Sequence, residues 1–360
     1  MDFALVALTF DALRLPPPPR LILLEARTLA SAHVPPYPPD MPVLLVGIES
    51  RELALLLHAV LLTTYPAGHL VQVVDGESME EKRLGELENS LFSESTCWFI
   101  PPLGEGTSFE SFAEIVAHLR APNGCPWDRE QTHESLRKHL LEEAYEAISA
   151  IDADDFIGMR EEFGDLLLQI VLQAQIANEE KQFNVNQVIQ GIHAKIVRRH
   201  PHVFGDLELD GVDGVLANWE KLKEQERGKK ENGKGLLDGV PVALPALSQA
   251  QEYQDRAARV GFDWPEIDGV LDKVKEEIEE IKGAEADFEL ASEIGDLFFV
   301  LVNFARWKKV DAESALRGTS MKFKKRFAYV EQGAKKRGRD LSALSLDEME
   351  SLWQEAKRIG

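Results

Sequence analysis

The chain has 360 residues, of which 44% are apolar and 28% are charged, enough for two or three domains with cores of their own. Its formal net charge of −22 argues against stable nucleic-acid binding, because phosphate contacts need concentrated Lys and Arg. No apolar run reaches the ~20 residues that a membrane-spanning helix needs, so we expect no membrane association.

The two cysteines, Cys97 and Cys125, form neither a disulfide framework nor a metal-binding pattern. Few unpatterned cysteines are typical of proteins of the reducing cytoplasm. Residues 1–10 (MDFALVALTF) have no basic region before their apolar residues, and no convincing cleavage site follows them. We therefore expect no secretory signal and a cytoplasmic location.

Residues 1–104 predict a small α/β domain. Short apolar runs at 43–48 (VLLVGI), 69–76 (HLVQVVDG) and 95–103 (STCWFIPPL) are typical of strands. Residues 50–66 (SRELALLLHAVLLTTYP) between the first two runs predict an amphipathic helix. The order strand, helix, strand indicates an α/β unit.

The rest of the chain is mainly all-α and repeats itself. Residues 105–225 and 239–360 carry the same motifs in the same order, and we call them copy one and copy two. Residues 226–238, which include the charged and Gly-containing segment ERGKKENGKG, predict a linker. A motif that occurs in both copies is much less often accidental than one that occurs once.

Each copy contains a cluster of acidic residues at helical spacing. Copy one has LLEEAYEAI followed by EEFGDLLLQI, and copy two has KVKEEIEEI followed by SEIGDLFFVL. The acids are Glu142, Glu143, Glu146, Glu162 and Asp165 in copy one and Glu276, Glu277, Glu280, Glu293 and Asp296 in copy two. At 100° per residue, the three acids of each first helix fall within one 100° arc.

Two antiparallel helices would bring these carboxylates together at the edge of their own apolar stripe. We expect that stripe to be buried, and its residues are Leu166, Leu167, Ile170 and Ala174 in copy one and Leu297, Phe298, Leu301 and Ala305 in copy two. Clustered carboxylates repel one another, and a divalent cation would remove the conflict. Ligands that are all carboxylate oxygens suit Mg²⁺ or Mn²⁺ rather than zinc or copper.

Basic and aromatic residues follow the acids in both copies at matching positions. These are Lys195, Arg199, Trp219 and Lys223 in copy one and Lys322, Arg326, Trp353 and Lys357 in copy two. Lys and Arg hold phosphates, and an aromatic ring can stack on a base. Together with the acids, they indicate a site for a metal and a nucleotide.

Other interpretations of these motifs account for less of the sequence. A solvated acidic helix face would not need the same pattern twice. A di-iron four-helix protein needs Glu-x-x-His pairs, which neither copy has. The pair His200 and His202 lacks partner histidines for a metal site, and Pro201 indicates that a helix ends there.

The motifs resemble the MazG-type nucleoside triphosphate pyrophosphohydrolases over residues 107–360. The resemblance is carried by APNGCPWDREQTHESLRKHLLEEAYE and KIVRRHPHVFGD in copy one, and by LPALSQAQEYQDRAARVGFDW and EIGDLFFVLVNFAR in copy two. It implies two tandem all-α domains in which the ten acids hold Mg²⁺. It implies that the four basic and aromatic residues of each copy contact the nucleotide.

This resemblance implies hydrolysis of NTPs to NMP and diphosphate, with Glu143, Glu146, Glu277 and Glu280 as the candidate catalytic acids. Helix pairs this short cannot enclose a nucleotide alone, so we expect two copies to face each other, and a homodimer. The alternative function is a non-catalytic module that binds nucleotides or alarmones.

Residues 1–104 resemble the trailing part of a tetrapyrrole-methylase-like domain. The resemblance rests on RELALLLHAVLLTTYPAGHLVQVVDG and LFSESTCWFIPPL. The segment has no Gly-rich loop that could hold S-adenosylmethionine. We therefore expect a truncated domain that packs against the helices or mediates assembly, without methyl transfer.

Overall fold

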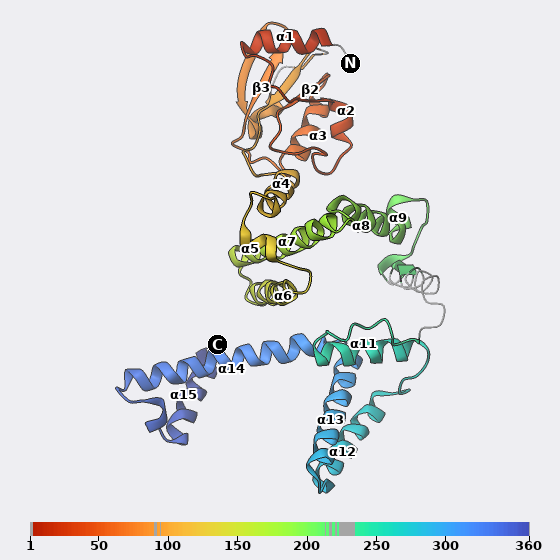
Figure 1. Ribbon diagram of the computed structural model, residues 1–360, viewed down its shortest axis with the longest axis vertical. Coiled ribbons are helices and arrows are strands. Elements are labelled where there is room, and N and C mark those ends of the chain that lie inside the picture. The colour runs from red at the N-terminus through yellow and green to blue at the C-terminus, as the bar shows by residue number, and fades with distance from the viewer. Residues whose placement is uncertain are drawn as a thin grey trace. The chain divides into compact units, whose positions relative to one another are not determined.

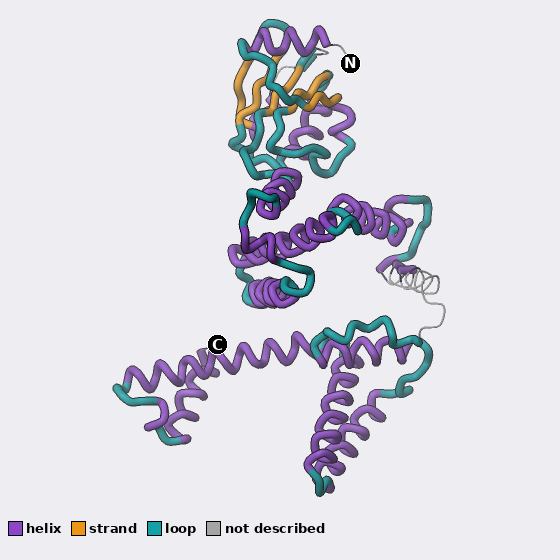
Figure 2. Tube along the Cα trace, in the orientation of Figure 1, coloured by secondary structure: helices purple, strands orange, loops and turns teal. Residues whose placement is uncertain are grey.

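The computed structural model describes residues 3–89, 92–93, 95–212, 214–215, 218–219, 222 and 235–359. It divides into two compact units, residues 1–195 and 196–360. Figure 2 shows that strands occur in the N-terminal part and that helices make up the rest of what is described. The predicted fold class, mainly all-α behind a small α/β domain, is confirmed.

The N-terminal domain is built on one five-stranded sheet with the order β1-β2-β5-β3-β4. The strands are β1 (Ile22–Glu25), β2 (Val43–Val46), β3 (Leu70–Asp75), β4 (Ser78–Arg83) and β5 (Cys97–Ile100). β1 and β2 are parallel, and the other neighbours are antiparallel. The three predicted strands are β2, β3 and β5, while β1 and β4 were not predicted.

Successive side chains of β2 and β5 point to opposite faces of the sheet, and both faces are buried. Val43, Leu45 and Trp98 pack with α2 (Ala26–Ala30) and α3 (Arg51–Leu61). Leu44 and Phe99 point the other way and pack against α1 (Phe3–Leu13). Figure 1 shows α1 on one side of the sheet and α2 and α3 on the other. Side chains alternate between the faces of a strand, so each apolar run supplies both cores.

Five helices complete the first unit, together with the short 3₁₀ helix Leu84–Asn89 of the sheet domain. They are α4 (Phe109–Arg120), α5 (Pro126–Glu130), α6 (Arg137–Asp152), α7 (Phe156–Glu179) and α8 (Val185–Arg199), the last of which continues past the division between the units. Ser108 caps the start of α4: its Oγ accepts from the backbone N of Ser111 at 3.1 Å and donates to Asp40 Oδ2 at 2.5 Å. This contact joins α4 to the loop before β2.

The described residues of the second unit form helices joined by turns and loops, and none of them forms a strand. Its elements are α9 (Pro201–Phe204), α11 (Ala246–Arg259), α12 (Ile267–Gly283), α13 (Asp287–Trp307), α14 (Ala312–Lys336), a 3₁₀ turn (Leu341–Ala343) and α15 (Leu346–Ile359). Gln254 of α11 donates to the carbonyl of Phe299 of α13 at 2.7 Å. α14 and α15 share an apolar core of Val330, Ala334, Leu344 and Leu352. No helix among the described residues is long and apolar enough to cross a membrane.

The expectation that the apolar stripe beside the acids is buried is wrong for most of its residues. Leu167 and Ile170 of α7 and Phe298 and Leu301 of α13 are exposed, whereas Ala174 is buried. The buried apolar residues of α7 are Val171, Leu172, Ala174, Ile176 and Ala177. Among the described residues, α7 and α13 each bury other side chains within their own unit, which leaves much of the predicted stripe on each helix exposed.

The domain boundaries at 104, 225 and 238 stay predictions. Most of the predicted linker, residues 226–234, lies outside the described residues. The predicted end of a helix before Pro201 is confirmed, because α8 ends at Arg199.

Candidate metal centre

Two helical hairpins, α6–α7 and α12–α13, carry the predicted acids. In each hairpin the two helices pack against each other, and the two hairpins occupy equivalent positions in the two copies. In the first hairpin, Asp155 caps the start of α7: its Oδ1 accepts from the backbone N of Ile157 at 3.1 Å and of Gly158 at 3.0 Å. In the second, Glu289 Oε2 accepts from the backbone N of Ala286 at 3.4 Å. Both turns reverse the chain within about one helical turn, which makes the helices antiparallel (Figure 1).

Three acids of each hairpin converge. Their side chains each place a carboxylate oxygen within 4.8 Å of the others, and the two groups are Glu143, Glu146 and Glu162 in copy one and Glu277, Glu280 and Glu293 in copy two. In both groups the first two acids are three residues apart on one helix, and the third comes from the next helix. The predicted meeting of carboxylates across the hairpin is therefore present in both copies.

The other four predicted ligands lie outside these groups of three. Glu142 and Glu276 are exposed next to the first helix acid, and Asp296 is exposed on α13. Asp165 is half-buried, and its charge acts on Glu143 and Glu162. Their role as ligands stays a prediction.

The converging acids hold one another in their neutral form more readily than isolated acids do. Partial removal from water, followed by the charges of Asp165 and Glu146, raises the pKa of Glu143 above its ordinary range. The same two causes raise the pKa of Glu162, where Glu146 is the first neighbour, and of Glu293, where Glu280 is the first neighbour. The repulsion between carboxylates that the sequence predicts is thus present in the fold.

Two residues that the sequence analysis did not select contact the acids. Lys273 Nζ lies 2.7 Å from Glu277 Oε1 and 3.0 Å from Glu276 Oε1. Hydrogen bonds to these two carboxylates, that to Glu277 first, raise the pKa of Lys273. At the equivalent position of copy one, His139 Nδ1 lies 3.5 Å from Glu142 Oε2. Their spacing of three and four residues from the acids was the available signal.

The groups fit a hard divalent cation. Their donors are all carboxylate oxygens, the ligands that Mg²⁺ and Mn²⁺ prefer. Glu277 is 2% exposed, and its Oε2 is buried without a hydrogen-bond partner among the described residues. A buried carboxylate oxygen with no partner is costly, and a cation would satisfy it.

Of the predicted nucleotide-contacting residues of copy two, Lys322 and Arg326 lie on α14, and Trp353 and Lys357 lie on α15. Lys357 Nζ lies 5.9 Å from the centre of the Trp353 ring, and Phe323 lies 5.2 Å from it. Nε of Arg326 is shielded from solvent and has no partner among the described residues. No hydrogen bond or ion pair within this described part of the chain joins Lys322 or Arg326 to the acids of α12 and α13.

The corresponding residues of copy one are only partly described. The Arg199 guanidinium lies over the Trp219 ring at 5.6 Å from its centre. Lys195 is an exposed residue of α8 and belongs to the first compact unit, whereas Arg199 and Trp219 belong to the second. Lys223 lies outside the described residues.

Comparison with known proteins agrees with this geometry. The profile of the MazG nucleotide pyrophosphohydrolase domain matches residues 131–204 and 267–330, which contain both groups of acids. The chain is 44% identical over 252 residues to the nucleoside triphosphate pyrophosphohydrolase/pyrophosphatase MazG of Thermotoga maritima, covering 70% of this chain and 96% of that protein. The chain belongs to the MazG family.

Two further relatives extend the comparison. The nucleoside triphosphate pyrophosphohydrolase of Escherichia coli is 45% identical over 250 residues, which cover 68% of this MazG-family chain and 95% of that protein. The uncharacterized protein YabN of Bacillus subtilis is 42% identical over 291 residues, covering 78% of this chain and 59% of that protein. The match to the Escherichia coli protein supports the MazG assignment over most of the length of that protein.

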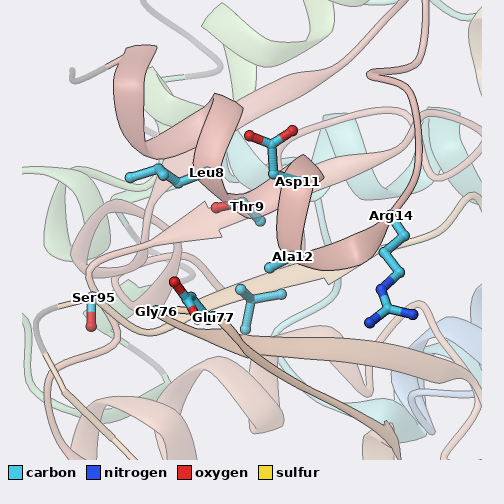
Figure 3. A pocket seen from close by; sticks show the side chains of 9 residues that line it. Leu8, Thr9, Asp11, Ala12, Arg14, Gly76, Glu77 and Ser95 are labelled. Atoms are coloured by element: carbon cyan, nitrogen blue, oxygen red, sulfur yellow. The ribbon is translucent and has the colours of Figure 1, made fainter.

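The N-terminal domain of this MazG-family chain holds a separate cavity of about 590 Å³. Figure 3 shows its lining, which includes Asp11 of α1, Arg14 just after this helix, Glu77 in the turn after β3, and Ser95 before β5. This mixture of single charges differs from the convergent acids of the hairpins. The MazG profile does not reach residues 1–130, so the resemblance of this domain to a tetrapyrrole methylase stays a prediction.

Proposed function

We propose that the protein hydrolyses nucleoside triphosphates to nucleoside monophosphates and diphosphate, with Mg²⁺ or Mn²⁺ held by the acids of the two hairpins. The observation that carries this proposal is the convergence of three carboxylates at equivalent positions of both copies in a MazG-family chain. A divalent cation there would neutralise charge on the triphosphate oxygens.

The side chains divide the work between binding and proton transfer. The residues that would hold the cation are Glu143, Glu146 and Glu162 in copy one and Glu277, Glu280 and Glu293 in copy two. The candidate catalytic acids are Glu143, Glu146, Glu277 and Glu280, of which one that is not fully used as a ligand orients or deprotonates the attacking water. The raised pKa of Glu143 brings that carboxylate closer to the range in which a base works near neutral pH.

The attack is directed at the α-phosphorus, and the diphosphate leaves. Lys322 and Arg326 stabilise the charge that develops on the leaving group, and Lys195 and Arg199 do so in copy one. The Trp353 ring beside Lys357 provides a surface on which a base can stack, as the Trp219 ring does in copy one.

Product analysis tests this proposal. The purified protein, incubated with a panel of NTPs and Mg²⁺ in ¹⁸O-labelled water, is expected to release NMP and diphosphate with the label in the NMP. Attack at the α-phosphorus places the oxygen of water on that atom. The control reaction with chelated metal is expected to give no product. Release of NDP and orthophosphate would contradict the proposed point of attack.

We also propose that the exposed stripes of α7 and α13 are covered by a second chain. Phe163, Leu167 and Ile170 of α7 occupy the same repeat positions as Ile294, Phe298 and Leu301 of α13, and all six side chains are exposed. Apolar faces of this kind mark interfaces, and a two-fold dimer is the commonest way to cover them.

Sedimentation over a range of protein concentrations is expected to show a homodimer. Phe298→Glu should weaken the dimer, because a charge would enter the covered stripe. Phe288→Glu, at an exposed position at the start of α13, should leave it intact. A monomer that is fully active at low concentration would contradict the proposal.

The free thiols of Cys97 and Cys125 support a cytoplasmic location and a housekeeping role in the nucleotide pool, which we include in the proposal.

A further inference from the structure

In copy two a lysine contacts one of the three converging acids, whereas the equivalent residue of copy one contacts an acid outside its group. The Lys273 ammonium contacts Glu277 Oε1 at 2.7 Å and Glu276 Oε1 at 3.0 Å. Glu277 is a member of the converging group, and its side chain is 3% exposed. Lys273, which is itself one third exposed, therefore neutralises an acid that is almost fully buried.

The equivalent residue of copy one is His139, four residues before Glu143 as Lys273 is four residues before Glu277. Its Nδ1 is 3.5 Å from Glu142, which is exposed and lies outside the converging group. No ion pair among the described residues joins His139 to Glu143. No Lys or Arg ion pair among the described residues reaches Glu143, Glu146 or Glu162, so the converging acids of copy one lack the lysine contact that Glu277 has in copy two.

We propose that Lys273 is the resident counter-ion of the copy-two acids, which a divalent cation must displace, so that free Mg²⁺ or Mn²⁺ binds more tightly to copy one than to copy two. The inference rests on the proposed metal site. It adds a residue that sets the metal affinity of one copy and not of the other.

The physical reason is a competition for the same oxygens. A metal ion that binds Glu277 takes over the charge that Lys273 now neutralises, and the ammonium next to the bound metal repels it. The cost is that of one ion pair at the edge of solvent plus this repulsion, about ten-fold in the dissociation constant. A metal ion that is bound to a triphosphate brings negative charge with it, and the ammonium of Lys273, once released from Glu277, can pair with that charge. The predicted difference in affinity between the two copies therefore applies to the free metal ion.

Mn²⁺ titration of the full-length protein, followed by electron paramagnetic resonance of the free ion and without nucleotide, tests the proposal. The two sites are measured separately in backgrounds that silence one copy, Glu162→Gln with Asp165→Asn and Glu293→Gln with Asp296→Asn. Copy one is expected to bind Mn²⁺ about ten-fold more tightly than copy two.

The reciprocal substitutions should reverse the difference. Lys273→Met should tighten the copy-two site about ten-fold, and His139→Lys should weaken the copy-one site by a similar factor. Lys275→Met is the matched control, because Lys275 pairs with Asp272 at 2.8 Å, outside the acid group. Circular dichroism of each variant checks that the hairpin has folded.

The outcomes are distinguishable. Equal affinities at the two copies, or no change with Lys273→Met and His139→Lys in folded variants, would overturn the inference while leaving the proposed metal sites in place. Failure of both copies to bind Mn²⁺ would overturn the proposed function as well.

Discussion

The double variant Glu293→Gln with Asp296→Asn is expected to lose most of the NTP hydrolysis, by about a hundred-fold or more in kcat/KM. The amides keep the size of the side chains and remove the two negative charges that α13 supplies to the copy-two acids. Because the charge on the triphosphate grows as the reaction proceeds, weaker metal binding costs more in the transition state than in the ground state.

The corresponding copy-one variant, Glu162→Gln with Asp165→Asn, is expected to lose less activity. α14 carries Lys322, Lys324, Lys325 and Arg326 together, whereas α8 ends at Arg199, directly before His200 and Pro201. The positive charge available to a leaving diphosphate is therefore greater in copy two. Steady-state kinetics with the preferred NTP measures both variants.

A third double variant controls for charge alone. Glu279→Gln with Glu285→Gln removes two exposed acids from the same hairpin without touching the converging group. It should retain activity. Equal losses in the copy-one and copy-two variants would show that the copies share the turnover.

Removal of the divalent cation is expected to abolish hydrolysis, and its return is expected to stabilise the fold by an amount that grows with pH. The pKa values of Glu143, Glu162 and Glu293 are raised in the folded protein. The folded state therefore binds more protons than the unfolded chain just above the ordinary carboxylate range. The metal-free protein loses this contribution to stability as the pH rises through the raised pKa values, when the clustered carboxylates ionise and repel.

A bound cation acts in the opposite sense, because it needs the ionised carboxylates. At a concentration a hundred times its dissociation constant, Mg²⁺ should add about 2.7 kcal/mol to the free energy of unfolding. Thermal melts with and without Mg²⁺, between pH 5 and pH 8, measure the increment. The control for salt screening of the charges is a buffer of the same ionic strength that contains no divalent cation. An increment that is the same at both ends of this range would mean that the converging acids do not bind the metal.

Hydrophobic patterning along single elements was enough to predict much of the N-terminal sheet. β2, β3 and β5 are buried apolar runs, which sequence periodicity reports directly. β4 reads SMEEKR and is exposed or half-buried, so it is held by its pairing with β3 rather than by burial. Such an edge strand has no apolar signature, and the sequence did not indicate it.

The sequence by itself determined the repeat and the hairpin acids, because helical spacing places Glu143 and Glu146, or Glu277 and Glu280, on one face before any tertiary contact forms. Tertiary structure alone decided which acids converge, since the approach of α7 to α6 selects Glu162 and leaves Glu142 in solvent. Tertiary structure also decided that Leu167 of α7 and Phe298 of α13 are exposed, because each helix buries only the face on which its neighbours pack. Burial depends on these neighbours, and a sequence periodicity records only that an apolar face exists.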